Sequence, residues 1–278
     1  MSVITVLGAS GFIGAHLVAR LQQLNVPYLA PDREEELAGK SLGHLIYCIG
    51  LTADFRHRSF ETIDAHVCTL LKAIKESEFD SLLYLSSVRL YHGQEKSANE
   101  DDPVRVNPLH PDHLYNLSKA MGESLSLNCR KPAHVVRLSA VYGPDFASEN
   151  FLSAIIRDAI LKKKVVLETS LDSERDYVSV GDVVDLLIKI STGGRQRIYN
   201  VASGINVSHR EVTRVVSEFT GCNVEIVDSA PKIASPIINI ERIKEEFGFQ
   251  PSRFLDDVGK LVDLFKAHYA RRGHRING

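Results

Sequence analysis

The sequence has no excess charge of either sign and no apolar run long enough to span a membrane. Its 33 lysines and arginines are nearly balanced by 35 aspartates and glutamates, which leaves a net charge of −2. This balance gives no electrostatic reason to expect nucleic acid or an anionic membrane as a partner. The basic run Lys162 to Lys164 is interpreted as a solvated helix end. A strand expected from residue 3 leaves no room for a signal peptide, so we expect a cytoplasmic protein.

Cysteine is scarce as well, and its four positions lack the spacing of metal ligands. Cys48 lies in a strand-like apolar run and Cys68 in a helical one, so buried free thiols are the simpler interpretation. Free thiols fit a reducing compartment. No metal site is predicted.

The chain is long enough, at 278 residues, to bury the core of one large α/β domain or of a domain with a smaller lobe. Short apolar runs alternate with helical periods along its first half, which is typical of a doubly wound parallel sheet of the Rossmann type. We predict a dinucleotide-binding domain at 1–144, which strands near 165–202 partly rejoin. Residues 145–278 are expected to form mainly a small C-terminal α+β lobe that binds the substrate.

A glycine-rich turn follows the first predicted strand, which covers residues 3–7. Gly8, Gly11 and Gly14 are spaced by three and three, and a helical period begins after them. Glycines let the backbone approach a pyrophosphate, and the helix N-terminus offers free N–H groups and a partial positive charge. Glycines also serve as plain turn residues, but strand, turn and helix together predict a dinucleotide site. Its expected members are Gly8, Ser10, Gly11, Phe12, Ile13 and Gly14.

Asp32 follows a second apolar run, 26–30, and lies eighteen residues after Gly14. That distance suits the carboxylate that binds the adenosine ribose hydroxyls. The alternative is an ordinary turn aspartate after a proline. The neighbouring Arg33 is able to hold a 2′-phosphate, so NAD is favoured over NADP only modestly.

Only some ten residues separate Asp32 from the next apolar run, 43–50. This segment is too short for a helix, a strand and their connections. Gly50, at the end of the run, is expected to approach the adenosine side of the cofactor. A plain turn glycine explains it almost as well.

Three side chains carry the predicted chemistry. Ser87 lies just past the end of a predicted strand, 81–86, where open parallel sheets bind their ligands. Tyr115 and Lys119 stand four residues apart on one helix, and both are also expected to contact the cofactor. A nearby ammonium is expected to lower the phenol pKa from about 10 by roughly 1–3 units. Phenolate then exchanges a proton with a sugar hydroxyl that Ser87 orients. The alternative is a tyrosine on a packed helix face.

The chain resembles the extended short-chain dehydrogenase/reductases, the nucleotide-sugar epimerase/dehydratase family. The resemblance rests on GASGFIG (8–14), LYLSSVRLYHG (83–93), VVRLSAVYGP (135–144), RDYVSVGDV (175–183) and IYNVASG (198–204). It implies Ser87, Arg89, Tyr91 and Arg175 as substrate-binding residues, with Arg175 at the nucleotide pyrophosphate. Pairing of Arg175 with neighbouring acids is nearly as good an explanation.

The resemblance also implies a homodimer, formed through the helices that carry His66 and Tyr115. His66 stands where the family commonly has asparagine. Family members usually have another strand between Asp32 and residue 43, which this chain has lost or shortened.

Several positions depart from the family pattern, so the identity of the sugar cannot be transferred. Val88 and Arg89 replace the Asp–Glu pair of the dehydratases, which argues against dehydration. Ala140 replaces an asparagine that usually contacts substrate, and residues 168–170 replace a Gly-Asp-Gly turn.

The expected activity is NAD(P)-dependent hydride transfer at a carbon, C4, of a nucleotide-linked sugar. It would serve an epimerase or, alternatively, a reductase of a 4-keto-6-deoxy sugar. A non-catalytic dinucleotide sensor or scaffold protein is the alternative of another class.

Overall fold

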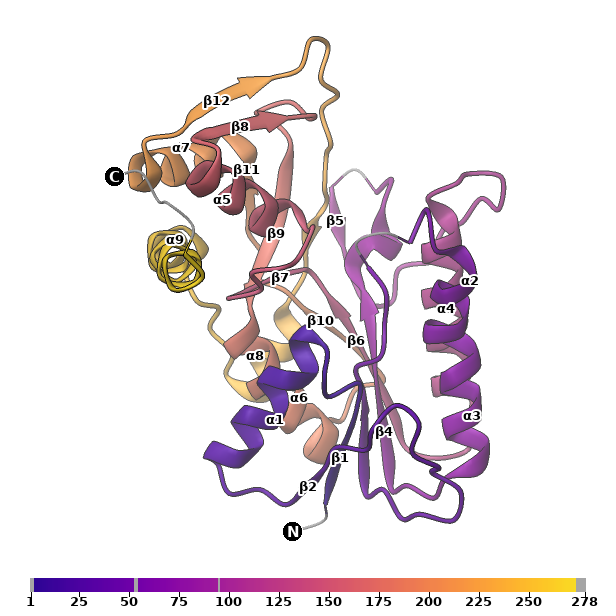
Figure 1. Ribbon diagram of the computed structural model, residues 1–278. Helices are drawn as coiled ribbons and strands as arrows, with labels where there is room; N and C mark the ends of the chain where they lie inside the picture. The colour runs from indigo at the N-terminus through magenta and orange to yellow at the C-terminus, as the bar shows by residue number, and fades with distance from the viewer. Residues whose placement is uncertain (1–2, 53–54, 95, 274–278) are drawn as a thin grey trace.

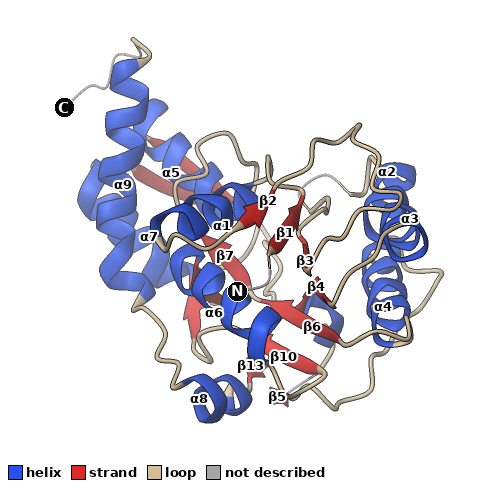
Figure 2. Cartoon of the chain, turned by 90° about the horizontal axis from the view of Figure 1, so that it is seen from below, coloured by secondary structure: helices blue, strands red, loops and turns tan. Residues whose placement is uncertain are grey.

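The computed structural model describes residues 3–52, 55–94 and 96–273, and its centre is a parallel sheet with helices on both faces (Figures 1 and 2). Within these residues the sheet has the strand order β10-β6-β4-β3-β1-β2. The strands are β1 Ile4–Leu7, β2 Tyr28–Leu29, β3 His44–Tyr47, β4 Ser81–Ser87, β6 Ala133–Leu138 and β10 Ile198–Val201, and all of their pairings are parallel. The predicted doubly wound α/β fold is confirmed.

The strand order reverses at β1, because the chain passes first to β2 on one side and then to β3 on the other. Such a topological switch point is where open parallel sheets bind their ligands, at the carboxyl ends of the strands. The segments that leave β1 and β3, at Gly8 and at 48–50, flank this point. The fold therefore places the glycine turn at the ligand-binding edge.

Helices cover the two faces of the sheet as separate layers (Figure 2). One face carries α1 Phe12–Gln23 and α6 Val180–Gly193. The other carries α2 Ser59–Ile63, a π-helical turn η1 Asp64–Cys68, α3 Thr69–Glu76 and α4 His113–Leu127. Strands buried on both faces read as continuous apolar runs, which explains why β1, β3 and β4 were recognisable in the sequence.

The helix expected to carry His66 is interrupted. Residues 64–68 form a π-helical turn between α2 and α3. A π turn inserts one extra residue into the helical ladder and is found mostly at functional sites. The apolar period of the sequence continues through it and did not reveal it.

The segment between β2 and β3 is a loop with an isolated bridge from Ser41 to Glu78, so β2 forms the edge of the sheet. The predicted lack of a further strand here is confirmed. The second apolar run is predicted at 26–30, but only two of its residues form β2. β2 lies at the edge of the sheet and pairs with one neighbour, so a short strand is sufficient.

The remaining C-terminal elements pack around a second apolar core above the sheet (Figure 1). A three-stranded sheet is formed by β7 Ala140–Tyr142, β9 Glu174–Ser179 and β11 Asn206–Ser208, and β8 Lys164–Leu167 pairs with β12 Asn223–Ile226. The helices of this lobe are α5 Phe151–Leu161, α7 His209–Thr220 and α9 Phe254–Arg271. A capping box of Ser208 and Glu211 begins α7.

Short elements join the two parts. They are the 3₁₀ turn η2 Val88–Tyr91, the pair β5 Ser97–Ala98 and β13 Ile237–Ile238, and α8 Glu241–Phe247. Among the helices of the described residues, none has the combination of length and apolar character needed for a membrane span.

Candidate active site

The glycine turn brings β1, β3 and α1 into direct contact. Gly8 has a φ of +85°, and a Cβ added to it would lie 2.9 Å from the backbone nitrogen of Ile49. A Cβ on Gly14 would lie 2.2 Å from the carbonyl oxygen of Gly8. No larger residue fits at Gly14 without moving α1 off the turn, so these glycines are needed for close backbone packing.

The N-terminus of α1 is not capped by a side chain. Its N-cap residue, Gly11, provides no capping hydrogen bond, and the first turn carries no acidic residue. The backbone N–H groups of this turn and the positive end of the helix dipole thus suit an anion. Ser10 and Gly11 are exposed here, whereas Phe12 and Ile13 are partly buried against the core of the sheet.

Asp32 and Arg33 lie in the exposed loop after β2. The backbone of Asp32 makes a local turn, because its carbonyl accepts from the backbone N–H of Glu35 at 3.1 Å. The Glu35 carboxylate in turn accepts from the backbone N–H of Asp32 at 3.2 Å and pairs with Lys40 at 2.5 Å. This geometry agrees with a turn aspartate and with an exposed ribose ligand, so both interpretations stay open.

Ser87, Tyr115 and Lys119 meet at the carboxyl end of β4. The Ser87 hydroxyl accepts from the backbone N–H of Arg89 at 3.2 Å, and it lies near enough to the Tyr115 phenol to act on its pKa. The Lys119 ammonium donates to the carbonyl oxygen of Leu85 at 2.9 Å and lies 6.0 Å from the centre of the Tyr115 ring.

The electrostatics of this group differ from the prediction. Burial raises the pKa of the Tyr115 phenol above its usual value of 10, while Ser87 and Arg89 act to lower it. Burial lowers the pKa of Lys119 to about 7, although Glu123 and Cys48 act in the opposite direction. In the protein alone the pKa of Tyr115 therefore lies above its usual value, because desolvation outweighs the influence of Ser87 and Arg89.

Gly50 lies beside the proposed catalytic lysine. A Cβ added to Gly50 would be 3.5 Å from Lys119 Nζ and 3.5 Å from His66 Nε2. Gly50, which was expected on the adenosine side of the cofactor, lies next to the group that includes Tyr115. The segment after β3 thus joins the glycine turn, through Ile49, to the catalytic end of the site.

His66 is the site residue that sequence reasoning undervalued. It lies in the π turn η1 and is fully buried. Its Nε2 accepts from the backbone N–H of Leu51 at 3.1 Å, and its Nδ1 is 2.8 Å from the Ser118 hydroxyl. Because Nε2 accepts a hydrogen bond, the proton of the neutral ring is on Nδ1, and His66 donates to the Ser118 hydroxyl. Ser118 in turn donates to the carbonyl oxygen of Tyr115 at 2.8 Å. The departure from asparagine at this position was its only signal in the sequence.

A cluster of charges borders the Tyr115 ring. Asp112 pairs with Arg56 at 2.5 Å and with Arg89 at 3.1 Å. The guanidinium carbon of Arg89 lies 5.7 Å from the centre of the Tyr115 ring. Arg175, on β9, lies close enough to lower the pKa of Arg89, for which burial is the largest cause. Arg89 and Arg175, both predicted as substrate-binding residues, therefore act on each other as like charges, while Asp112 pairs with Arg89.

Tyr91 differs from the other predicted substrate-binding residues because it belongs to the core. It is 1% exposed, its hydroxyl donates to Asn200 at 2.7 Å, and it accepts from Arg137 at 2.8 Å. The hydroxyl has no face left for a ligand, so we remove Tyr91 from the substrate-binding set.

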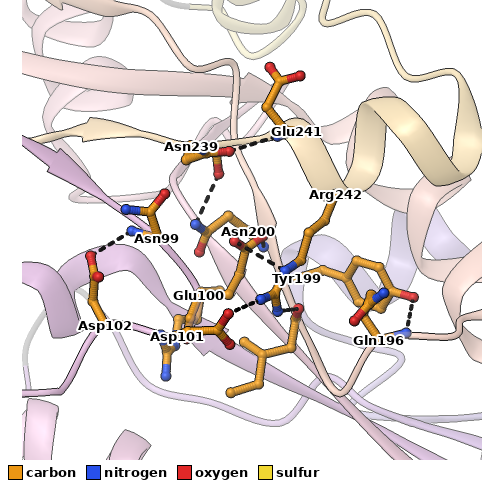
Figure 3. Close-up of polar contacts among 12 residues, drawn as sticks. Asn99, Glu100, Asp101, Asp102, Gln196, Tyr199, Asn200, Asn239, Glu241 and Arg242 are labelled. Carbon is orange, nitrogen blue, oxygen red and sulfur yellow. Dashed lines mark hydrogen bonds and ion pairs between the residues drawn. The ribbon is translucent and has the colours of Figure 1, made fainter.

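The same buried network continues across the molecule (Figure 3). The backbone N–H of Asn200 donates to Glu100 at 3.0 Å, and the Asn200 side chain donates to the carbonyl of Asn239 at 3.0 Å. Arg242, on α8, reaches both Glu100 and Asp101. These contacts join β10, α8 and the 99–102 loop, and they stabilise the sheet edge opposite β2.

Similarities to known proteins agree with this geometry. Residues 4–67 and 48–202 match the NAD dependent epimerase/dehydratase family. A dTDP-4-dehydro-6-deoxy-D-allose reductase of Streptomyces bikiniensis is 24% identical, over 95% of this chain and 96% of that protein. A GDP-6-deoxy-D-mannose reductase of Pseudomonas aeruginosa is 29% identical, over 82% of this chain and 83% of that protein.

The fold also resembles that of a solved structure, MoeE5 in complex with UDP-glucose and NAD. The TM-score is 0.81 at 21% identity, over 96% of this chain and 99% of that one. At this level of identity the likeness concerns the fold.

Proposed function

The chain belongs to the NAD dependent epimerase/dehydratase family, and we propose that it transfers hydride between NAD(P) and one carbon, C4, of a nucleotide-linked sugar. The observation that carries this proposal is the grouping of a hydroxyl, a phenol and an amine: Ser87 acts on the buried Tyr115 phenol, and Lys119 lies one helical turn away on α4 with its Nζ 6.0 Å from the Tyr115 ring. A binding module needs a cofactor cradle, but it has no use for a hydroxyl, a phenol and an amine at the adjacent strand end.

The glycine turn fits the dinucleotide. Gly8 and Gly14 leave no space for side chains between β1, β3 and α1, and the N-terminus of α1 has no capping side chain to displace. We propose Gly8, Ser10, Gly11, Phe12, Ile13 and Gly14 for the pyrophosphate region, with Gly50, Tyr115 and Lys119 at the nicotinamide end. Asp32 and Arg33 remain the proposed adenosine ribose contacts, with NAD preferred over NADP.

The chemistry follows from the positions of the three side chains. When bound, the dinucleotide donates or accepts the hydride. Tyr115 gives a proton to the sugar oxygen, or takes one from it, and Ser87 hydrogen-bonds the same oxygen and holds it in line. Lys119 supports the phenolate when charged. Arg89 and Arg175 remain the proposed substrate contacts, since both are positively charged and a nucleotide diphosphate is an anion.

The reductase alternative is favoured over the epimerase. Both curated relatives described above are reductases of deoxy-hexose nucleotides. Val88 and Arg89, in the place of an acidic pair, argue against dehydration. A reductase makes one hydride transfer and then exchanges its cofactor, so reduced dinucleotide should bind reversibly, whereas an epimerase retains its cofactor between transfers.

Substitution of Tyr115 by phenylalanine tests the proposed function. Turnover of a 4-keto-6-deoxy nucleotide sugar, followed by oxidation of the reduced cofactor, should fall by at least about 10²-fold because the proton donor is lost. Binding of the dinucleotide, measured by calorimetry, should persist. Unchanged turnover in Tyr115→Phe, or persistent absence of turnover in the wild type with a panel of such sugars, would favour the sensor or scaffold alternative.

We also propose a homodimer that forms through α3 and α4. Apolar side chains remain exposed on these helices, with Leu71 at 41% and Met121 at 55% exposure, and they border a groove that Ile74 and Leu125 complete. Exposed apolar surface of this kind is typical of protein interfaces.

A cytoplasmic location and the division into 1–144 and 145–278 stay predictions. The free state of all four cysteines supports the cytoplasmic location.

A further inference from the structure

Arg89 is a cation that faces the phenol of Tyr115 from a different element than Lys119 does. Its guanidinium carbon lies 5.7 Å from the centre of the Tyr115 ring and 4.9 Å from that of Phe55. Lys119 Nζ lies no closer to the Tyr115 ring, at 6.0 Å from its centre, and donates a hydrogen bond to the carbonyl of Leu85. Two cations are therefore placed at similar distances from the ring, one from η2 and one from α4.

The two cations differ in how firmly they keep their charge. Burial lowers the pKa of Lys119 to about 7, so its ammonium loses its proton as the pH rises through neutrality. Burial also lowers the pKa of Arg89, but from a starting value of 12.5, and Asp112 acts against that shift. A guanidinium stays charged throughout the pH range in which a protein works.

Among the described residues that face Tyr115, His66, Tyr84 and Ser87 do not supply a positive charge. His66, which meets the Tyr115 ring edge-on at 5.3 Å, is kept neutral because burial and Lys119 lower its pKa to about 2. Tyr84 on β4 is buried, and its pKa is well above 10. Ser87 contributes a neutral hydrogen bond.

We propose that Arg89 supplies the lasting positive charge that stabilises the Tyr115 phenolate, and that Asp112 limits its strength. Because Arg89 acts through Tyr115, it is a positioning residue in this role. Asp112 divides its negative charge between Arg56 and Arg89, so it offsets only part of the charge of Arg89. The assignment rests on the proposed function of Tyr115 as the acid and base, and it gives Arg89 a task besides contact with substrate.

The test is a pH titration of the tyrosinate absorbance of the full chain. The signal of Tyr115 is obtained by subtracting, for each variant, the matching protein that also carries Tyr115→Phe. Arg89→Gln should raise the pKa of Tyr115 by about one unit, which is a tenfold change in the phenol–phenolate equilibrium. An opposite charge at this distance changes a pKa by roughly 1–3 units, and Asp112 offsets part of the charge of Arg89. Arg89→Lys, which retains the charge, should shift it by less than half as much.

Two further variants separate charge from structure. Asp112→Asn should move the pKa of Tyr115 in the opposite direction, downward, because Arg89 loses its counter-charge. Arg56→Gln removes a cation from the same cluster without touching the Tyr115 ring and should shift the pKa by less than half the Arg89→Gln value. A general loosening of the site would move all four variants alike, and that result overturns the proposal.

The failure of this inference is distinguishable from failure of the proposed function. If Tyr115→Phe abolishes turnover while Tyr115 titrates identically in wild type and Arg89→Gln, only the role of Arg89 is refuted. If Tyr115→Phe retains turnover, the proposed function fails whatever the titrations show. If Arg89→Gln does not fold, the two other variants still test the role of Arg89. Arg89→Lys should shift the pKa of Tyr115 slightly upward, and Asp112→Asn should shift it downward.

Discussion

At the scale of single residues, burial controls the protonation of this site more strongly than pairing does. His66 illustrates this, because the pKa of its imidazole is lowered to about 2, first by desolvation and then by Lys119. The ring is satisfied as a neutral group, accepting from Leu51 and donating to Ser118. A protonated ring would carry an N–H at Nε2 opposite the backbone N–H of Leu51, so two donors would face each other. The site therefore requires the neutral imidazole.

The stability of the protein should depend on pH through His66. As the pH falls below 6.5, the unfolded chain protonates this histidine and the folded chain does not, so the unfolded state is favoured. From pH 7 to pH 5 this side chain should reduce the free energy of unfolding by about 2 kcal/mol. Urea unfolding of His66→Asn should therefore show a smaller loss over that interval, even from a lower starting stability.

The exposed His57 provides the matched control, since His57→Asn should lose as much stability as the wild type between pH 7 and pH 5. Equal losses in His66→Asn and wild type would contradict the assignment of a neutral, buried imidazole.

At the scale of elements, α4 joins the catalytic group to the core. Its buried face carries Tyr115, Ser118, Lys119 and Glu123 in successive turns. Glu123 accepts from Arg137 on β6 through two hydrogen bonds of 2.9 and 2.7 Å, and both side chains are less than a tenth exposed. The ion pair thus fixes the helix against β6, and it leaves Tyr115 and Lys119 facing the site.

Substitution of Glu123 by glutamine should destabilise the fold by about 3–5 kcal/mol, because it leaves the buried charge of Arg137 without its partner. Denaturant unfolding measures this effect. The exposed i,i+4 pair of Arg214 and Glu218 on α7 offers a control. Glu218→Gln should cost less than about 1 kcal/mol, and a similarly small loss in Glu123→Gln would show that the α4–β6 pair is not a main attachment.

At the scale of the whole molecule, the described residues form three apolar cores. One joins the sheet to α1 and α6, a second packs the other face of the sheet against α3, and the third fills the C-terminal lobe among α5, α7 and α9. Arg175 lies on β9 of the lobe, whereas Arg89 follows β4 of the sheet. The two arginines proposed to contact the substrate therefore come from different parts of the molecule.

The proposed dimer makes a prediction at this scale. Met121→Lys places a charge in the exposed apolar groove of α3 and α4, and it should convert particles of twice the 30.9 kDa chain mass into single chains. Light scattering after size exclusion measures this. Leu264→Lys, at a similarly exposed position on α9, should remain dimeric. A wild-type protein that is monomeric at micromolar concentration would refute the interface.

The sequence by itself determined the architecture and the elements on which the proposed site residues lie. Buried parallel strands read as apolar runs, the glycine spacing marked the turn after β1, and Ser87 could be placed at a strand end because parallel strands terminate at one edge. The short segment after Asp32 correctly predicted the lack of a further strand. Each of these features is local, so periodicity and spacing suffice to recognise it.

Only the tertiary structure decided what surrounds those residues. The pKa of Tyr115 depends on how deeply α4 is buried and on Arg89, which reaches the ring from another element. The π turn that directs His66 inward, and the network that takes Tyr91 out of the site, arise from contacts between residues far apart in the chain. Desolvation and long-range charge depend on the whole fold, and no spacing along a sequence encodes them.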